Sequence, residues 1–304
     1  MKQLFLILFS CILLTVNAQD WSIPKLGYGG WEVEQEFTLN KNRRNILLIS
    51  EATAYTVALV GLNQLWYADY PKSSFHFIND NEEWLQMDKM GHMSASYYTG
   101  VAGIKAYEWA GFSRKNAIWY GGMTGSIFLT VIEVLDGTSE EWGASSGDLI
   151  ANTTGSLLAI GQALKWNEQR IQLKYSYSPS NMAAKNPEQL GSNHLERALK
   201  DYNGQTYWLT LNLKSLLQIE NPDFPSWLSL ALGYGADEMV NPYQEKGDAE
   251  RYRQFLMSFD VDLNKIKTKN KTLNSVLHTF GFLKFPTPAI QYRNGNIFFH
   301  PIYY

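Results

Sequence analysis

Two groups of polar residues that could do chemistry lie inside otherwise apolar stretches of this chain. The first is Asp88-Lys89-Met-Gly-His92, in which a carboxylate and an imidazole four residues apart would share one face of a helix. The second group follows about forty residues later. Its members are Glu133, Asp136, Asp148 and Asn152. Ionised groups are costly to bury unless they are paired, so this concentration is the first place to look for a functional site.

Helical spacing within the second group suggests that the polar faces converge. If they do, carboxylates, an imidazole and an amide come together, and such a set could ligate a divalent metal or supply an acid and a base. The candidate catalytic residues are Asp88, His92, Glu133 and Asp148. The candidate ligand-binding residues are Glu51, Asp88, His92, Glu133, Asp136, Asp148 and Asn152. None of the spacings is a specific metal signature, so the sequence assigns neither a metal nor a reaction.

A structural role explains the same residues without any chemistry. Asp88 and Asp148 would cap helices, and the other polar groups would pair in a buried network that keeps the helices in register. Glu51 stands in the middle of an apolar run and needs a partner, so we expect it to face this cluster near Lys89 or His92. Lys89 would project about 100° around the helix from Asp88, and we expect it to point to solvent. The sequence leaves both interpretations open.

The polar groups belong to a region with a helical pattern. Four apolar segments, diluted by Gly, Ala, Ser or Thr, occupy residues 46–66, 90–112, 117–135 and 149–166. Each is long enough for a buried core helix or a membrane span, and the small residues would allow helices to approach closely. The pattern therefore predicts an N-terminal bundle of about four apolar helices.

After Trp166 the pattern of apolar residues changes from helical to alternating. Residues 171–177, 206–213, 228–234 and 254–263 alternate between the two faces of an extended chain. Repeated alternation predicts antiparallel strands, and bulky apolar groups gathered on one face are typical of a membrane barrel wall. The predicted fold class is α+β, with the helical bundle followed by an antiparallel β-sheet or partial β-barrel. The predicted divisions are a signal peptide at 1–18, a helical region at 19–166 and an antiparallel β region at 167–304.

The first residues predict the compartment. Lys2 precedes an apolar run that ends in Val16-Asn17-Ala18, as in a secretory signal peptide cleaved after Ala18. Cys11 is the single cysteine and lies in this run, so the mature chain would hold no disulfide. The formal net charge of −3 gives no basic footprint for nucleic acid. The chain has 18 Tyr and 10 Trp, residues that gather at membrane interfaces, and we therefore expect a membrane or envelope lipid as partner.

Three motifs give this chain its resemblance to a known family. They are Asp88-Lys-Met-Gly-His92, Glu133-Val-Leu-Asp136 and Ser146-Gly-Asp148-x-x-x-Asn152-x-x-Gly155. Together they resemble the YfiM-like family of predicted periplasmic or lipoprotein envelope proteins, and more distantly the VanZ-like membrane proteins. The resemblance covers roughly Phe75 to Leu164, and the later stretch Lys200–Trp208 is similar to the longer outer-envelope members. It implies a location in the cell envelope, in the periplasm or outer membrane, and no particular reaction.

Two functions from different classes are compatible with these observations. The leading hypothesis is a non-enzymatic outer-envelope scaffold or lipid-binding protein whose polar cluster holds the helices together. The alternative is a metal-assisted hydrolase or transferase that acts on a lipid or a cell-wall precursor. A divalent metal is the cofactor that the candidate residues suggest, and the sequence does not decide whether the protein is an enzyme.

Overall fold

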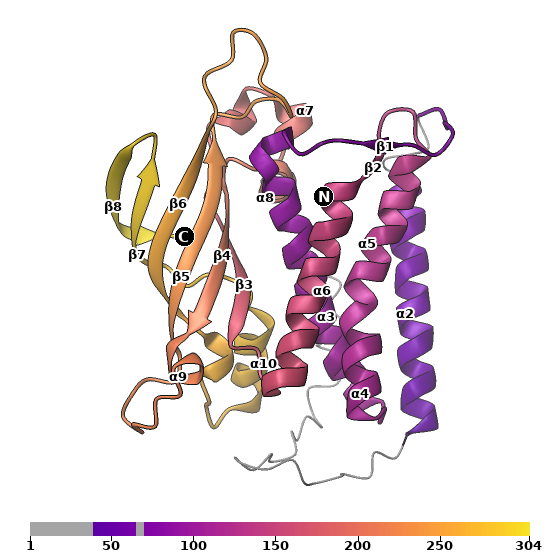
Figure 1. Ribbon diagram of the computed structural model, residues 1–304, viewed down its shortest axis with the longest axis vertical. Coiled ribbons are helices and arrows are strands. Elements are labelled where there is room, and N and C mark those ends of the chain that lie inside the picture. The colour runs from indigo at the N-terminus through magenta and orange to yellow at the C-terminus, as the bar shows by residue number, and fades with distance from the viewer. Residues whose placement is uncertain (1–38, 65–69) are drawn as a thin grey trace.

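The computed structural model describes residues 39–64 and 70–304 of the chain. This part is an α+β fold in which long helices stand side by side next to a curved antiparallel sheet (Figure 1). The predicted α+β class is therefore confirmed. The predicted signal peptide and Cys11 lie outside the described residues.

Four long helices correspond to the four apolar segments of the sequence. They are α2 (Lys41–Leu62), α3 (Met87–Trp109), α5 (Gly122–Gly137) and α6 (Ser146–Trp166). A short helix, α4 (Arg114–Asn116), and a π-helical turn, η3 (Ala117–Gly121), lead into α5. Two short parallel strands, β1 (Phe77–Ile78) and β2 (Ala144–Ser145), pair just before α3 and α6 begin. Residues 65 and 66, which end the first apolar segment, lie outside the described part.

Helix α3 lies at the centre of the helical layer and packs on both α5 and α6. The backbones approach so closely that glycine is required at the contacts. A Cβ atom on Gly100 would lie 2.7 Å from the Gly122 carbonyl oxygen, and one on Gly155 would lie 2.1 Å from the Met93 carbonyl oxygen. Helix α2, by contrast, approaches α3 at few points, and only 22% of its most apolar stretch is buried. The predicted bundle of four helices is therefore not confirmed, because three helices pack tightly and the fourth is peripheral.

Six strands form the sheet, each antiparallel to the next along the chain. They are β3 (Ile171–Tyr177), β4 (Gln205–Asn212), β5 (Leu228–Asp237), β6 (Tyr252–Val261), β7 (Thr287–Arg293) and β8 (Asn296–Tyr303). The sheet curls and brings distant strands together. The Tyr303 ring of β8 lies 5.7 Å from the Trp208 ring of β4. It does not close, and β3 and β8 are its two edges. The predicted antiparallel sheet is confirmed as an open, curled sheet.

Short helical elements occupy the connections at both ends of the sheet (Figure 1). Before α3 lies η2 (Glu83–Gln86), and between β3 and β4 lie η4 (Met182–Ala184), α7 (Pro187–Leu190) and α8 (His194–Lys200). Helix α9 (Leu213–Leu216) follows β4, and η5 (Leu263–Lys265) and α10 (Lys271–Thr279) follow β6.

The sheet buries polar side chains and exposes apolar ones. On β6 the buried residues include Gln254, Ser258 and Asp260, whereas the exposed residues include Phe255, Met257 and Phe259. Inside the curl, Lys174 Nζ lies 2.6 Å from Asp260 Oδ2, and both side chains are fully buried. The alternation that the sequence shows thus places its polar members inside, which is the reverse of an ordinary soluble sheet.

Candidate functional site

A strained turn sets the direction in which α3 begins. Residues Trp84–Gln86 adopt left-handed backbone angles, with φ between 47° and 69°. This conformation is unfavourable for side-chain-bearing residues and persists only where surrounding contacts hold it. Here the Tyr234 hydroxyl donates a hydrogen bond from the sheet to the Leu85 carbonyl oxygen. The first two turns of α3 then carry Asp88 and His92 into the space beside α6.

The start of α6 brings the second part of the site. Ser145 caps this helix, because its Oγ accepts a hydrogen bond of 3.0 Å from the Asp148 N–H. The same hydroxyl donates to Asp80 Oδ1 at 2.6 Å. Asp148 is only 4% exposed, and Asn152, one turn later on the same face, is fully buried. Asp148 therefore lies in the first turn of α6, near the helix start as predicted, but the cap is Ser145 and not Asp148.

Asp88, His92 and Asp148 form a compact group between α3 and α6. His92 Nε2 lies 3.8 Å from Asp88 Oδ2 and 3.9 Å from Asp148 Oδ2. On the other side of the ring, His92 Nδ1 lies 3.0 Å from Asn152 Oδ1. This oxygen can only accept, so Nδ1 donates and Nε2 is left facing the two carboxylates. One ligand atom from each of the three residues lies within 4.8 Å of the others, and a small closure would allow metal–ligand bonds of about 2.1 Å.

Lys89 also enters this cluster, so the prediction that it points to solvent is wrong. Its ammonium pairs with Asp80 and lies 3.1 Å from Asp148 Oδ1 and 3.9 Å from Asp88 Oδ2. The long aliphatic stem allows the charge to return to the cluster although the Cα position faces away from Asp88. Sequence reasoning missed Asp80, which comes from the loop before α3, as a member of the cluster.

Glu133 and Asp136 of α5 are placed differently from each other. Glu133 Oε2 accepts the Ser145 N–H at 2.9 Å, and its negative charge raises the pKa of His92. Asp136 is buried one turn further along, where its carbonyl oxygen accepts the Ser139 N–H at 3.0 Å. It does not belong to the group of three whose ligand atoms lie within 4.8 Å of one another. The structure thus brings Glu133 to the edge of the cluster.

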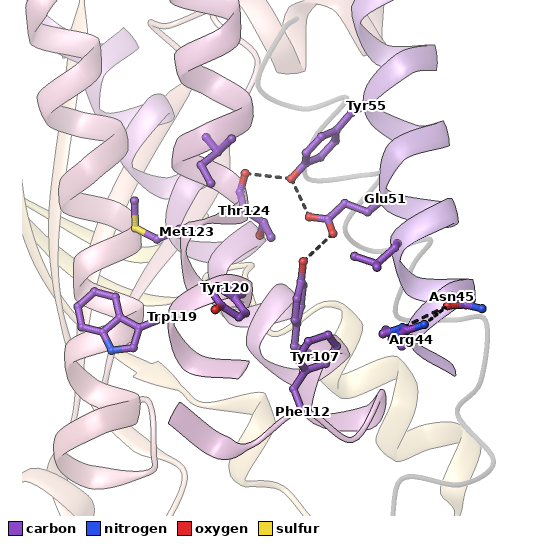
Figure 2. A pocket seen from close by; sticks show the side chains of 12 residues that line it. Arg44, Asn45, Glu51, Tyr55, Tyr107, Phe112, Trp119, Tyr120, Met123 and Thr124 are labelled. Carbon is purple, nitrogen blue, oxygen red and sulfur yellow. Dashed lines mark hydrogen bonds between the residues drawn. The ribbon is translucent and has the colours of Figure 1, made fainter. Parts of the chain in front are cut away.

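The prediction that Glu51 faces this cluster is wrong. Its carboxylate accepts hydrogen bonds from Tyr55 at 3.2 Å and Tyr107 at 3.0 Å, in a separate pocket (Figure 2). Tyr107 lies fifteen residues after His92 on α3, which is about 22 Å along a helix. The carboxylate did need polar partners, as expected, but tyrosine hydroxyls at the far end of α3 provide them.

The cluster contains more carboxylates than basic groups. Its acids are Asp80, Asp88, Glu133 and Asp148, and its basic groups are Lys89 and His92. Burial, reinforced by the charge of Asp88, raises the pKa of Asp148 to about 7. Burial alone would lower the pKa of His92, but Asp148, Asp88 and Glu133 together raise it above its usual value. Both shifts favour the protonated forms of Asp148 and His92, because the cluster lacks positive charge. A divalent cation would supply that positive charge in place of the protons.

The sheet half of the chain contributes one residue to the cluster. The Tyr202 hydroxyl, in the turn before β4, donates a 2.8 Å hydrogen bond to Asp88 Oδ1 across 114 residues of sequence. Sequence reasoning missed this role, and no spacing or period links the two residues. The stretch Lys200–Trp208 stood out only through the resemblance to longer envelope proteins.

Two helical segments of the described chain are long and apolar enough to cross a membrane. They are Lys41–Leu62 and Arg114–Gly137, of which 22% and 56% of the most apolar stretch is buried. Core helices of soluble proteins share these properties, so length and composition alone do not put either segment in a membrane.

The fold and the site together define an α+β protein with a buried acid–histidine cluster between two glycine-packed helices. Residues 76–162 match the sequence model of a family described as predicted periplasmic lipoprotein (DUF2279). The match covers under a third of the chain and contains all three motifs, so the resemblance to an envelope family of unknown function is confirmed there. The description also agrees with the predicted location in the cell envelope, whereas the likeness to VanZ-like proteins has no support. No curated protein and no solved structure matches the chain.

Proposed function

We propose that this envelope protein binds a divalent transition metal through Asp88, His92 and Asp148. The observation that carries the proposal is the orientation of the imidazole. Its Nδ1–H donates to Asn152 Oδ1, and its Nε2 faces two carboxylate oxygens at 3.8 and 3.9 Å. A metal-ligating histidine usually donates its second ring nitrogen to a neighbouring oxygen in this way. A cation or a proton is needed at Nε2, because its lone pair would otherwise face two negative groups.

The donor set favours a particular class of ion. One imidazole nitrogen and two carboxylate oxygens suit Zn²⁺, Mn²⁺ or Fe²⁺, whereas Mg²⁺ and Ca²⁺ prefer oxygen ligands alone. Three protein ligands would leave coordination positions open for water or for a substrate oxygen. Such a site would suit metal-assisted hydrolysis or group transfer on an envelope lipid or cell-wall precursor, the enzymatic alternative that the sequence suggested.

Metal binding can be tested on the purified, chelator-treated full chain. Calorimetric titration with Zn²⁺ and Mn²⁺ should give about one site, with much weaker binding of Mg²⁺. The variants His92→Gln and Asp148→Asn should weaken Zn²⁺ binding by roughly a hundredfold or more, since each removes one of three ligands. The control His194→Gln changes an exposed histidine of α8 and should bind like the wild type. Absence of binding, with a loss of stability in both cluster variants, would instead support the scaffold hypothesis.

We also propose that the outer face of the sheet lies against lipid. Leu209, Leu232, Met257, Ile290 and Phe299 are successive cross-strand partners from β4 to β8, and each is at least 37% exposed. The next row begins at the buried Tyr207 of β4 and continues through Tyr234, Phe255, Tyr292 and Ile297. Neither row contains a charge, while the buried side chains on the other face of β6 and β7 include Gln254, Ser258, Asp260 and Gln291. Exposed apolar rows over a polar interior are typical of a sheet whose outer solvent is lipid.

A further inference from the structure

Helix α2 contacts the other helices at two places and leaves a pocket between them. Leu47 packs with Tyr107 near one end of the helix, and Ala58 packs with Phe128 nearer the other end. The pocket between these contacts has a volume of about 710 Å³, within the usual range for small-molecule sites (Figure 2). It shares no residue with the Asp88–His92–Asp148 group.

Glu51 gives this pocket one negative charge with unused capacity. Its two oxygens accept hydrogen bonds from Tyr55 and Tyr107, whereas an ionised carboxylate can accept about four. Burial, followed by the charge of Glu51, raises the pKa of the Tyr107 hydroxyl above its usual value, so this group remains a donor. Tyr55 also lies 3.0 Å from the Thr124 carbonyl oxygen and shares its single proton between two acceptors. Within the described chain, no ion pair involves Glu51.

The wall beside Glu51 is aromatic. The Tyr107 ring lies 5.0 Å from Phe112 and 6.3 Å from Tyr120, measured between ring centroids. Trp119 and Tyr120 stand on the π-helical turn η3 and are 41% and 55% exposed. Short π-helical segments of this kind are frequent at functional sites. The remaining wall is mainly aliphatic and is formed by Leu48, Met123 and Ile127.

We propose that this pocket binds an organic ammonium ion that carries a hydrocarbon chain. The ammonium would donate to Glu51 and lie against the aromatic faces, and the chain would follow the aliphatic wall. A carboxylate ligand would meet Glu51 with like charge, and a neutral alcohol would leave it without a counter-charge. Arg44 lines the same pocket but hydrogen-bonds to its neighbour Asn45 at 2.9 Å. Its positive charge would suit the phosphate of a phospholipid headgroup, if the ammonium belongs to one.

The charge preference can be measured on the full wild-type chain with three ligands of one chain length. Calorimetric titration below the micellar range should show binding of octylammonium at least about tenfold tighter than binding of octanol, with octanoate weakest. Glu51→Gln should abolish this preference while leaving octanol binding unchanged. Glu108→Gln, which removes an exposed carboxylate of the same helix as Tyr107, should behave like the wild type.

Two further measurements keep the result decisive. If Glu51→Gln does not fold, Trp119→Leu changes a partly exposed wall residue and should weaken octylammonium binding more than octanoate binding. Equal affinity of the wild type for octylammonium and octanol would overturn the proposal. Dihexanoyl phosphatidylethanolamine and dihexanoyl phosphatidylglycerol then identify the source of the ammonium. Selective binding of the first indicates a lipid headgroup, and binding of octylammonium alone indicates a free amine.

Discussion

Lys89 holds an ammonium 3.1 Å from Asp148 Oδ1, beside the place where a metal ion would sit. The substitution Lys89→Met removes this competing charge and keeps much of the side-chain volume. We expect the affinity for Zn²⁺ to rise by roughly tenfold or more, because a unit positive charge a few ångströms from a divalent ion is strongly repulsive at low effective dielectric. Calorimetric titration of the chelator-treated variant measures the change. Without metal the variant should be less stable than the wild type, since Asp80 and Asp148 lose their partner.

The control for this prediction is Lys185→Met, which removes an exposed lysine that lies 4.0 Å from Glu238. Neither its metal affinity nor its stability should change by more than a few tenths of a kcal/mol, as is usual for a surface pair. A lower Zn²⁺ affinity in Lys89→Met would contradict the proposed ion position, because it would mean that the lysine supports binding.

Lys284 makes the stability of the sheet depend on pH. Its ammonium lies 4.0 Å from Asp260 Oδ1 in the buried interior, and burial lowers the pKa of Lys284 to about 8. In the unfolded chain a lysine titrates near pH 10.4, so between these values the unfolded state binds the additional proton. Stability must then rise with pH. We expect the free energy of unfolding to increase by about 2 kcal/mol between pH 7 and 9.5.

Urea unfolding of the wild type and of Lys284→Met at several pH values isolates this contribution. The penalty for the buried charge is fully present below pH 8 in the wild type and is absent from the variant, so the difference between the two proteins should shrink as pH rises. Lys246→Met, at an exposed position, should keep the slope of the wild type. Parallel pH profiles for the wild type and Lys284→Met would show that this lysine does not carry the effect.

At the scale of whole elements, two glycines of α6 provide a matched pair. A Cβ on Gly155 would lie 2.1 Å from the Met93 carbonyl oxygen of α3, whereas one on Gly161 would meet no described atom within 4 Å. Gly155→Ala should therefore force the helices apart and lower the free energy of unfolding by about 2–3 kcal/mol. Gly161→Ala should raise it by about 0.5–1 kcal/mol, because alanine favours the helix. Chemical denaturation measures both, and similar effects at the two positions would contradict the close contact.

The sequence predicted the individual helices and strands better than it predicted which of them pack against one another. Apolar runs and alternation identified the long helices and most of the strands, because burial requires those periods within a single element. The same patterns could not say that α2 lies at the periphery, and Glu51 was consequently assigned to the wrong end of α3. Closure of the sheet was also undetermined, since it depends on which edge strands meet.

Within the candidate site, helical spacing brought Asp88 to His92 and Asp148 to Asn152, and both pairs lie in the cluster. Asp80, Lys89 and Tyr202 were missed for a different reason. Their roles depend on a loop, a long flexible side chain and a hydroxyl from the sheet, none of which leaves a period in the sequence.

At the scale of the whole molecule, tyrosine hydroxyls connect the helical layer with the sheet. Tyr97 Oη lies 3.2 Å from the Ile171 carbonyl oxygen, Tyr98 donates to the Leu173 carbonyl oxygen, and Tyr202 donates to Asp88. Tyr234 donates in the same manner to the turn before α3. Part of the high aromatic content therefore serves contacts between the layers. Because Tyr202 binds a proposed metal ligand directly, occupancy of the cluster would be coupled to the position of the sheet.

The outer face of the sheet gives the last prediction. Met257 lies at the centre of the exposed apolar row, between Leu232 and Ile290, and is 49% exposed. If this face contacts lipid, a charge placed there must be brought into an apolar medium, which costs about 2–4 kcal/mol for lysine at the middle of a bilayer. Met257→Lys should therefore reduce the fraction of purified protein that floats with phosphatidylglycerol vesicles, although the positive charge would favour this anionic surface electrostatically.

Ala249→Lys adds the same charge in the exposed connection between β5 and β6 and should float at least as well as the wild type. The comparison separates apolar contact from charge attraction, because only the first depends on where the lysine stands. A wild type that remains in the aqueous fraction would contradict lipid contact. If it is then a dimer that Met257→Lys dissociates, the apolar rows cover a second copy of the chain instead, since a buried lysine without a partner would destabilise that interface as well.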